Sequence, residues 1–318
     1  MSGPDAPAGI EIRDATTDDA AAMVEVIHAA FAARPRLDPP STQLAETVAS
    51  VGAAVAEHGG VVAVAEGRVV GSILLGVQGE RLGLRRVSVL PPHQGSGVAA
   101  AMARAAEARA AAAGRTGVEL LARAELPDNV TFWQRLGYAV VDRDGPYLTM
   151  ARELPVTVPL TTADDTRAAG ERLATLLRAG DLVILTGDLG AGKTTFTQGL
   201  GRGLGVRGQV TSPTFILARV HPTLGDGPGL VHVDAYRLGD VAELDDLDLD
   251  TPLRTSVAVV EWGEGMAETL AEDRLEITVR RLRGGEAAES LDDTDPRVLE
   301  VRPVGARWVG AGLRSALG

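Results

Sequence analysis

The sequence predicts two α/β domains in one chain, residues 1–152 and 153–318, and three observations lead to this prediction. First, 318 residues is the length of two ordinary domains. Second, segments of strand length and helix length alternate in both halves, which is typical of layered α/β folds. Third, the second half contains a glycine-rich turn between a buried strand and a helix. The boundary lies near Pro155, where an apolar segment ends and a proline restricts the backbone.

In the first half, the elements follow the order β-α-α-β-β-β-α-β-α-β. Thr17-Asp18-Asp19 offers caps for the first helix, and Gly59-Gly60 ends the second. Gly67-Arg68 joins two strands as a hairpin, and Gly114 ends a long Ala-rich helix. The expected strands are 10–15, 61–66, 69–77, 82–90, 118–122 and 147–151, and the expected helices are 17–31, 41–58, 97–113 and 130–136.

In the second half, a helix closed by Gly180 precedes an apolar strand, and the glycine-rich turn and a further helix follow. The remaining strands are recognised by their short apolar runs, and the chain ends in a helix. The expected strands are 182–186, 230–234, 257–262, 275–281 and 298–302, and the expected flanking helices are 164–178 and 306–317.

Composition excludes several classes of function. The chain has no cysteine, so disulfides, thiolate zinc sites and cysteine nucleophiles are excluded. Its most apolar stretch, 60–77, is interrupted by Glu66 and Arg68, and residues 1–8 do not resemble a signal peptide, so we expect a cytoplasmic protein without a membrane span. A net charge of -12 argues against autonomous binding of DNA or RNA. The second half carries most of it, with 17 basic and 26 acidic residues.

A phosphate-binding motif lies in the second half. Gly-Asp-Leu-Gly-Ala-Gly-Lys-Thr at 187–194 fits G-x-x-x-x-G-K-[ST] between a strand and a helix. The backbone N–H groups of such a loop surround phosphate oxygens, Lys193 reaches the β- and γ-phosphates, and Thr194 binds Mg²⁺. Lys193 is the only lysine among 31 basic residues, and arginine does not replace a compact ammonium there. The predicted ATP contacts of this segment are Gly187, Asp188, Leu189, Gly190, Ala191, Gly192, Lys193, Thr194 and Thr195.

Two further strands of the second half end in carboxylates. Asp234 closes an apolar strand, as a metal-binding carboxylate of a nucleotide site does, although strands also end in Asp at ordinary turns. Glu261 closes another strand and is a candidate for positioning water or the metal. The alternative is a cap or turn carboxylate followed by a core tryptophan, Trp262.

Four segments, 187–196, 210–215, 232–238 and 260–264, together resemble the TsaE (YjeE) family, the ATPase of bacterial tRNA threonylcarbamoyladenosine synthesis. The resemblance covers about 155–318 and implies a P-loop NTPase-like α/β fold. It implies catalytic roles for Lys193, Asp234 and Glu261, with Thr194, Asp234 and Glu261 serving the metal. It also implies that Trp262 and Thr211 lie near ATP, with 211–214 as a switch-like segment. Gly263 departs from the proline common in the family, which implies altered local stiffness.

This resemblance also implies partners. The family works with TsaB and TsaD proteins on adenosine 37 of tRNA, and its ATP hydrolysis supports turnover of the complex. We therefore expect tRNA to be held by partner proteins rather than by this acidic chain. The run 240–250 has six carboxylates in eleven residues and is interpreted as a solvated helix face, with a docking surface for a basic partner as the alternative.

A second motif lies in the first half, where 87–99 joins a strand to a long helix. Backbone N–H groups at such a helix start bind pyrophosphate. About 30 residues later comes Asn-Val-Thr-Phe-Trp-Gln-Arg-Leu-Gly-Tyr, 129–138. Together these segments resemble the GNAT acetyltransferase family over 8–152, which implies a mixed-sheet α/β domain that binds acetyl-CoA. The implied contacts are Val87, Val89, Gln94, Gly95, Ser96, Gly97, Val98, Ala99 and Asn129; the alternative for the last is helix capping by Asp128 or Asn129.

The acetyl-transfer chemistry is less complete in the sequence. Such a reaction needs a base for the amine proton and often a tyrosine acid for the leaving thiolate. Trp133 stands where the family commonly has that tyrosine, which leaves Tyr138 or Tyr147 as substitutes. The candidate bases are Glu80 or Glu119 through water and His93, which is otherwise a loop residue contacting solvent or phosphate.

The leading hypothesis is thus a fusion of a GNAT-like acetyltransferase of unknown acceptor with a TsaE-like ATPase. One alternative makes the first domain a non-catalytic module that binds CoA or a partner protein. The other makes the second domain a small-molecule phosphotransferase, against which the lack of a basic lid-like cluster after Lys193 counts.

Overall fold

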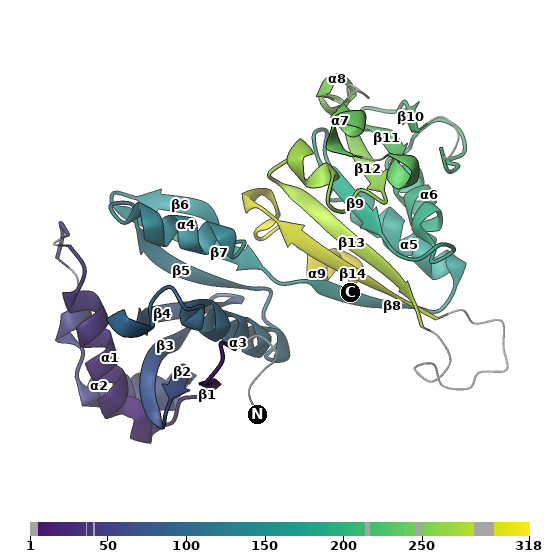
Figure 1. Ribbon diagram of the computed structural model, residues 1–318. Coiled ribbons are helices and arrows are strands. Elements are labelled where there is room, and N and C mark those ends of the chain that lie inside the picture. Colours follow the sequence, from purple (N-terminus) through teal and green to yellow (C-terminus); the bar gives the residue numbers. More distant parts are fainter. Residues whose placement is uncertain are drawn as a thin grey trace. The chain divides into compact units, whose positions relative to one another are not determined.

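The computed structural model describes residues 6–35, 37–40, 42–213, 217–238, 240–245, 250–282 and 296–318 (Figure 1). The chain divides into two compact units, Met1–Leu154 and Pro155–Gly318. Each unit contains a seven-stranded sheet flanked by helices, which confirms the predicted α/β class. No helix in the described ranges is long and apolar enough to cross a membrane.

The first unit has the strand order β1-β2-β3-β4-β5-β7-β6. Its one parallel pair is β4 with β5, and the pairing covers only Arg81–Leu84 against Gly117–Leu120. Both strands continue beyond this point, so they separate toward their carboxyl ends (Figure 1). The strands are β1 Ile10–Asp14, β2 Gly60–Ala65, β3 Arg68–Gln78, β4 Arg81–Val89, β5 Gly117–Arg123, β6 Ala139–Asp144 and β7 Tyr147–Glu153.

Helices cover both faces of the first sheet. Successive residues of β3 point to opposite faces, so Leu74 packs with helices α1 and α2 while Ile73 joins the core beneath α3. Met23 and Met102, both fully buried, fill these two cores. The helices are α1 Ala20–Ala32, α2 Val48–His58, α3 Val98–Ala112 and α4 Pro127–Arg135.

The second unit has the strand order β10-β11-β12-β9-β13-β14-β8, with a parallel centre of β11, β12, β9 and β13. Val183 and Leu185 of β9 face the large core under α5, α6 and α9, and Leu182 and Ile184 face a smaller core. The strands are β8 Val156–Leu160, β9 Leu182–Thr186, β10 Ala218–His221, β11 Gly229–Asp234, β12 Ser256–Glu261, β13 Arg274–Arg281 and β14 Arg297–Val304. The helices are α5 Ala163–Ala174, α6 Lys193–Gly203, α7 Val241–Asp245, α8 Asp250–Leu253 and α9 Leu313–Leu317.

Three strands were not expected from the sequence, and all lie near or at a sheet edge. β6 is mostly exposed and ends in Asp-Arg-Asp, β8 carries Pro159, and β10 has four residues, of which only His221 is buried. Edge strands need no continuous apolar run, because one side lacks a neighbour. Hydrophobic patterning therefore did not reveal them.

Several predicted boundaries are corrected. The helix expected at 41–58 begins at Val48, because Thr47 caps it by accepting from the Ser50 N–H at 3.1 Å, and a short 3₁₀ turn precedes it. The terminal helix expected at 306–317 is a 3₁₀ turn followed by α9, because Gly310 and Gly312 have positive φ angles between them. The predicted helix 164–178 ends at Ala174.

Candidate functional site

The predicted phosphate loop, residues 187–192, joins β9 to α6. Gly187, Gly190 and Gly192 have φ angles of +139°, +78° and +111°, which L side chains rarely adopt. A Cβ on Gly187 would lie 2.2 Å from the Val279 carbonyl oxygen, so this position also excludes side chains by contact. Gly192 caps α6 without a side chain, which leaves the first-turn N–H groups directed at an anion.

Lys193 lies folded into this loop. Its side-chain nitrogen donates to the carbonyl oxygens of Gly187 at 2.7 Å and Asp188 at 3.1 Å. The same nitrogen lies 3.7 Å from the ring centroid of Trp262. Burial lowers the pKa of Lys193, and the carboxylates of Glu261, Asp234 and Asp188 oppose this shift. The ammonium is therefore held by carbonyls and an aromatic face, at a position from which it can reach a phosphate.

Glu261, the last residue of β12, is 3% exposed and lies among polar side chains. The Thr194 hydroxyl donates to its Oε1 and Oε2 atoms at 3.1 and 3.3 Å. The Thr197 hydroxyl lies 3.4 Å from Oε1, and Nε2 of the buried His232 lies 2.8 Å from it. The carboxylate thus lies in a network with Thr194, the second residue of the helix that follows the loop, and does not cap a helix.

Asp234 lies opposite Glu261 in the parallel pairing of β11 with β12. It accepts from the Ser212 hydroxyl at 3.3 Å and from the Tyr236 N–H at 3.1 Å. The contact with Tyr236 is typical of an ordinary turn, which is the alternative that the sequence left open for Asp234. The Asp234 carboxylate therefore caps the turn after β11 and also lies beside the phosphate loop.

The residues at this point suit magnesium bound with a nucleotide. No group of three or more histidine, cysteine or acidic side chains in the described part of the chain is arranged to hold a metal by itself. Magnesium in nucleotide sites is usually held by one or two carboxylates together with phosphates and water. The Thr194 hydroxyl with the carboxylates of Glu261 and Asp234 supplies that smaller set.

The structure does not bring every predicted residue to this point. The Thr211 hydroxyl accepts from Arg219 at 3.0 Å, and Leu189 is 92% exposed at the loop tip. Thr214 lies outside the described residues, as do 246–249 of the acidic run. The described contacts of Lys193, Thr194 and Glu261 include neither Thr211 nor Thr195.

In the first unit, the predicted pyrophosphate loop joins β4 to α3. Gly95 and Gly97 have φ angles of +73° and +88°, and Gly97 caps α3. The Gln94 amide donates to the Val89 carbonyl oxygen at 2.9 Å, and the Ser96 hydroxyl donates to the His93 carbonyl oxygen at 2.6 Å. These side chains fix the loop's shape, so its backbone N–H groups are the atoms available to an anion at the helix start. Three apolar predicted contacts, Val87, Val89 and Val98, belong to the adjoining core.

The 129–138 segment forms α4 and the turn after it. The helix begins at Pro127 with Leu126 as its cap, so neither Asp128 nor Asn129 caps it. Trp133 is 2% exposed, and its ring packs edge to face against Phe132 and Tyr138 at 5.0 Å each. The tryptophan at the family's tyrosine position is therefore a core residue.

Tyr138 does not fit the role of thiolate acid. It is 1% exposed, and its hydroxyl donates to Glu107 Oε1 at 3.0 Å. Burial, with the Glu107 charge and hydrogen bond, raises the pKa of Tyr138 well above its usual value. Tyr147, the other candidate, lies opposite Arg123 in the pairing of β7 with β5, and the guanidinium lies 4.8 Å from the centroid of its ring.

The two candidate glutamate bases lie away from the loop. Glu119 pairs with Gly83 within the joined section of β4 and β5, and Glu80 precedes β4. The loop follows the other end of β4, which is nine residues long and thus spans about 30 Å. Neither carboxylate is therefore beside Gln94.

Comparison with known proteins assigns both units. The family model described as threonylcarbamoyl adenosine biosynthesis protein TsaE matches residues 160–287. The TsaE protein of Streptomyces coelicolor is 61% identical over 148 residues, which is 46% of this chain and 96% of the relative. The chain belongs to the TsaE family. The Mycobacterium tuberculosis TsaE protein is 48% identical over 133 residues, covering 40% of this chain and 79% of the relative.

The first half matches a second family, Acetyltransferase (GNAT), over residues 23–138.

Two solved structures are similar to different parts of the chain. Bacillus subtilis YdiB is 31% identical, and the match covers 50% of this chain and 91% of the YdiB chain with a TM-score of 0.38. The PaiA N-acetyltransferase of Thermoplasma acidophilum, in complex with coenzyme A, is 18% identical, covers 46% and 99%, and has a TM-score of 0.41. We call Met1–Leu154 the GNAT unit and Pro155–Gly318 the TsaE unit.

Sequence reasoning missed several polar residues of the TsaE unit, namely His232, Thr197, Ser212 and Tyr236. Two of them had a usable signal. His232 precedes Asp234 by two residues in a strand and so shares its face, and Thr197 follows Thr194 by three in a helix. Trp262, which is only partly buried, has a φ of +63° and lies 5.3 Å from the Tyr236 ring, which no sequence pattern shows.

The glycine that replaces the TsaE family's usual proline is closely packed. A Cβ on Gly263 would lie 2.7 Å from Val260 Cγ1 and 2.9 Å from Ala267 Cβ. The replacement therefore concerns packing as well as stiffness, because neighbouring side chains occupy the space that a larger residue would need.

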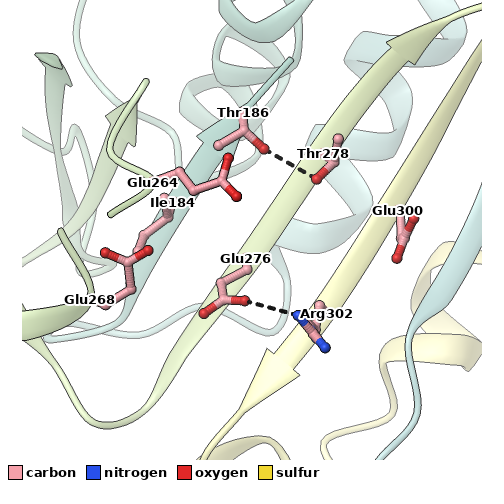
Figure 2. Close-up of a pocket in the computed structure, with 8 residues that line it drawn as sticks. All are labelled: Ile184, Thr186, Glu264, Glu268, Glu276, Thr278, Glu300 and Arg302. Atoms are coloured by element: carbon pink, nitrogen blue, oxygen red, sulfur yellow. Dashed lines mark hydrogen bonds and ion pairs between the residues drawn. The ribbon is translucent and has the colours of Figure 1, made fainter. Parts of the chain in front are cut away.

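A cavity of about 130 Å³ in the TsaE unit is lined by no residue of the phosphate loop, although Thr186, which directly precedes the loop, lines it (Figure 2). Ile184 and Thr186 of β9 line the cavity, whereas Val183 and Leu185 of the same strand face α6. The cavity therefore lies on the opposite face of the sheet from α6. Glu276 is paired with Arg274 at 2.7 Å and lies 3.8 Å from Arg302. We interpret this cavity as a polar sheet surface. Its lining residues are Ile184, Thr186, Glu264, Glu268, Glu276, Thr278, Glu300 and Arg302.

Proposed function

We propose that the TsaE unit is a magnesium-dependent ATPase that supports threonylcarbamoyladenosine synthesis at position 37 of tRNA. One observation carries this proposal: the only lysine of the chain lies inside the phosphate loop, beside a hydroxyl that contacts the carboxylate of Glu261. The names of the TsaE relatives supply the pathway. A small-molecule phosphotransferase is less well supported, because the names of the TsaE relatives refer to tRNA modification.

The following role is proposed for each residue when ATP binds, and the contacts above support it. Lys193 leaves the carbonyl oxygens of Gly187 and Asp188 and binds the β- and γ-phosphates. The N–H groups at the start of α6 bind phosphate oxygens. Thr194, with the carboxylates of Asp234 and Glu261, would hold Mg²⁺, which would neutralise charge on those phosphates. Glu261 would orient the attacking water.

We infer that proteins resembling TsaB and TsaD are the partners and that they hold the tRNA. Residues 153–318 carry 17 basic and 26 acidic side chains, and such a surface repels a polyanion. Slow ATP hydrolysis by the chain alone, accelerated when such partners are added, is the expected result. Fast turnover that is indifferent to partners would contradict this inference.

Complementation tests the pathway. A bacterium depleted of its own TsaE receives the full chain or the full chain with Lys193→Ala, and tRNA nucleosides are measured by mass spectrometry. We expect the unchanged chain to restore threonylcarbamoyladenosine and Lys193→Ala to fail, since the loop then lacks its cation. Restoration by both chains, or by neither at normal protein levels, would contradict the proposal.

For the GNAT unit we propose acetyl transfer from acetyl-CoA to an amine of unknown identity. The loop at the start of α3, with glycines at 95 and 97, supports cofactor binding. The buried Trp133 and Tyr138 favour the second candidate, a unit that binds CoA without turnover. Thiol release measured across amines and peptide N-termini separates the two: acetyl-CoA binding without release would establish the non-catalytic module.

A further inference from the structure

A histidine lies behind the carboxylate that we assign to ATP hydrolysis. His232 is in β11 between apolar residues, and its side chain is fully buried. Its Nε2 atom lies 2.8 Å from Glu261 Oε1, the shortest contact described for that carboxylate. Its neighbours along β11 are aliphatic: Leu230 and Val231 precede it and Val233 follows it, and all three are buried in the cores of the sheet.

The neighbours of Glu261 fix the position of the histidine proton. A carboxylate oxygen only accepts hydrogen bonds, so His232 donates from Nε2, and its Nδ1 atom carries the lone pair in the neutral ring. Nδ1 is buried and has no hydrogen-bond partner among the described residues. Leaving a polar atom unpaired costs about 1–3 kcal/mol, a cost that an aliphatic residue would avoid. Packing alone therefore does not explain the imidazole.

The contacts also show what the histidine does to the carboxylate. Oε1 accepts hydrogen bonds from His232 Nε2 at 2.8 Å and from the Thr197 hydroxyl at 3.4 Å. The Thr194 hydroxyl contacts both carboxylate oxygens. Thr194 and Thr197 belong to α6, whereas His232 belongs to β11. Without His232, both remaining donors would lie on the helix side, and the carboxylate would be free to turn about its last torsion angle.

We infer that His232 is a positioning residue of the ATPase site: its Nε2–H holds the Glu261 carboxylate against Thr194 in the orientation needed for metal binding and hydrolysis. This inference rests on the proposed function of the TsaE unit. A donor behind a metal-binding or catalytic carboxylate typically contributes about 10- to 100-fold in metal affinity or activity. His232 does not itself touch the nucleotide in this role.

Two amide variants of the full chain test the inference. In His232→Gln the side-chain nitrogen reaches close to the place of Nε2, whereas in His232→Asn it stops one methylene short. At saturating Mg²⁺ we expect His232→Asn to lower kcat about 10- to 100-fold with little change in KM for ATP, and His232→Gln to recover much of the loss. A fluorescent ATP analogue should bind all chains equally in EDTA, and Mg²⁺ should strengthen binding less in His232→Asn.

The outcomes separate this inference from the proposed function. A wild-type chain that does not hydrolyse ATP contradicts the proposed function, with Lys193→Ala as the inactive reference. Wild-type hydrolysis with both histidine variants unimpaired overturns the positioning role. Equal losses in the two variants, or failure of both to fold as judged by thermal unfolding, also overturn it, because His232 would then serve packing.

Discussion

At the scale of single residues, a substitution at Lys193 tests most directly whether the site needs the chemistry of one particular side chain. Its ammonium fits between two carbonyl oxygens and the Trp262 ring. Lys193→Arg keeps the charge but places a larger planar group there. We expect ATP affinity to fall by roughly tenfold or more, about 1.4 kcal/mol, measured by calorimetry.

Acetyl-CoA binding by the same Lys193→Arg chain serves as the control and should not change, since Lys193 belongs to the TsaE unit. Wild-type ATP affinity in this variant would show that the pocket accepts a guanidinium and would contradict the compact-cation argument.

Tyr138 was a candidate acid for the leaving thiolate, but its burial and its hydrogen bond to Glu107 indicate that it stabilises the fold instead. Tyr138→Phe removes the donor to Glu107, which Arg152 also holds at 2.9 Å. We expect the free energy of unfolding to fall by about 1.5 kcal/mol and thiol release to persist, measured by denaturant titration and by the acetylation assay. Loss of acetyl transfer with unchanged stability would contradict this assignment.

The Tyr138 hydroxyl also makes the free energy of unfolding of the GNAT unit depend on pH. Because the folded state raises its pKa, the stabilisation is fully present below the unfolded pKa, about 10. It is lost as pH rises beyond that value, since the unfolded chain ionises first. The difference in stability between wild type and Tyr138→Phe should therefore shrink at alkaline pH.

At the scale of elements, the phosphate loop depends on two glycines for different reasons. A Cβ on Gly187 would meet the Val279 carbonyl oxygen, whereas one on Gly190 would meet open space. Gly190→Ala should cost only about 1–2 kcal/mol for its positive φ. Gly187→Ala should cost more and abolish ATP binding, as thermal unfolding and calorimetry would show. Equal effects of the two variants would contradict the packing argument.

The start of the first helix depends on an ion pair. Asp19 accepts from both guanidinium nitrogens of Arg13, at 2.7 and 2.8 Å, and from the Thr16 N–H at 2.8 Å. The hydrogen bond from Arg13 is the main cause that lowers the pKa of Asp19 to about 2, with burial opposing it. Asp19→Asn should lower the unfolding free energy by about 2 kcal/mol at pH 7.

The sign of this effect sets its pH range. A lowered pKa gives stability that is present above the unfolded value, about 4, and is lost as pH falls through about 2. The gap between Asp19→Asn and wild type in denaturant titrations should therefore close toward pH 2. Asp18→Asn, at an exposed neighbour, is the control and should show no such gap.

The elements also show what the sequence was able to predict. Asp234 and Glu261 were selected because each closes an apolar strand, a pattern that needs no coordinates, and the parallel pairing of β11 with β12 places the two side by side. His232 was not selected, because an imidazole within an apolar strand looks like a core residue until its partner is seen. Tyr138 and Glu107 are 31 residues apart, so only the packing of α3 against the segment after α4 brings them together.

At the scale of the whole molecule, the chain is two separately packed units in sequence. Each of the four described hydrophobic clusters lies entirely on one side of the link between Leu154 and Pro155. Leu154 packs into the core of the GNAT unit, and Val156, on the other side, packs into that of the TsaE unit. Each unit thus holds its own apolar core, which is the physical requirement for independent folding.

This arrangement predicts that residues 1–154 and 155–318, expressed separately, each unfold in one cooperative transition. Each fragment should keep its own ligand, acetyl-CoA for the first and ATP for the second, because the predicted contacts of each ligand lie within one unit. A cut after residue 150 is the control: it removes the last three residues of β7 and Leu154, so the first fragment should lose stability. Fragments that fold only when mixed would show that the cores are not independent, whatever the ligands do.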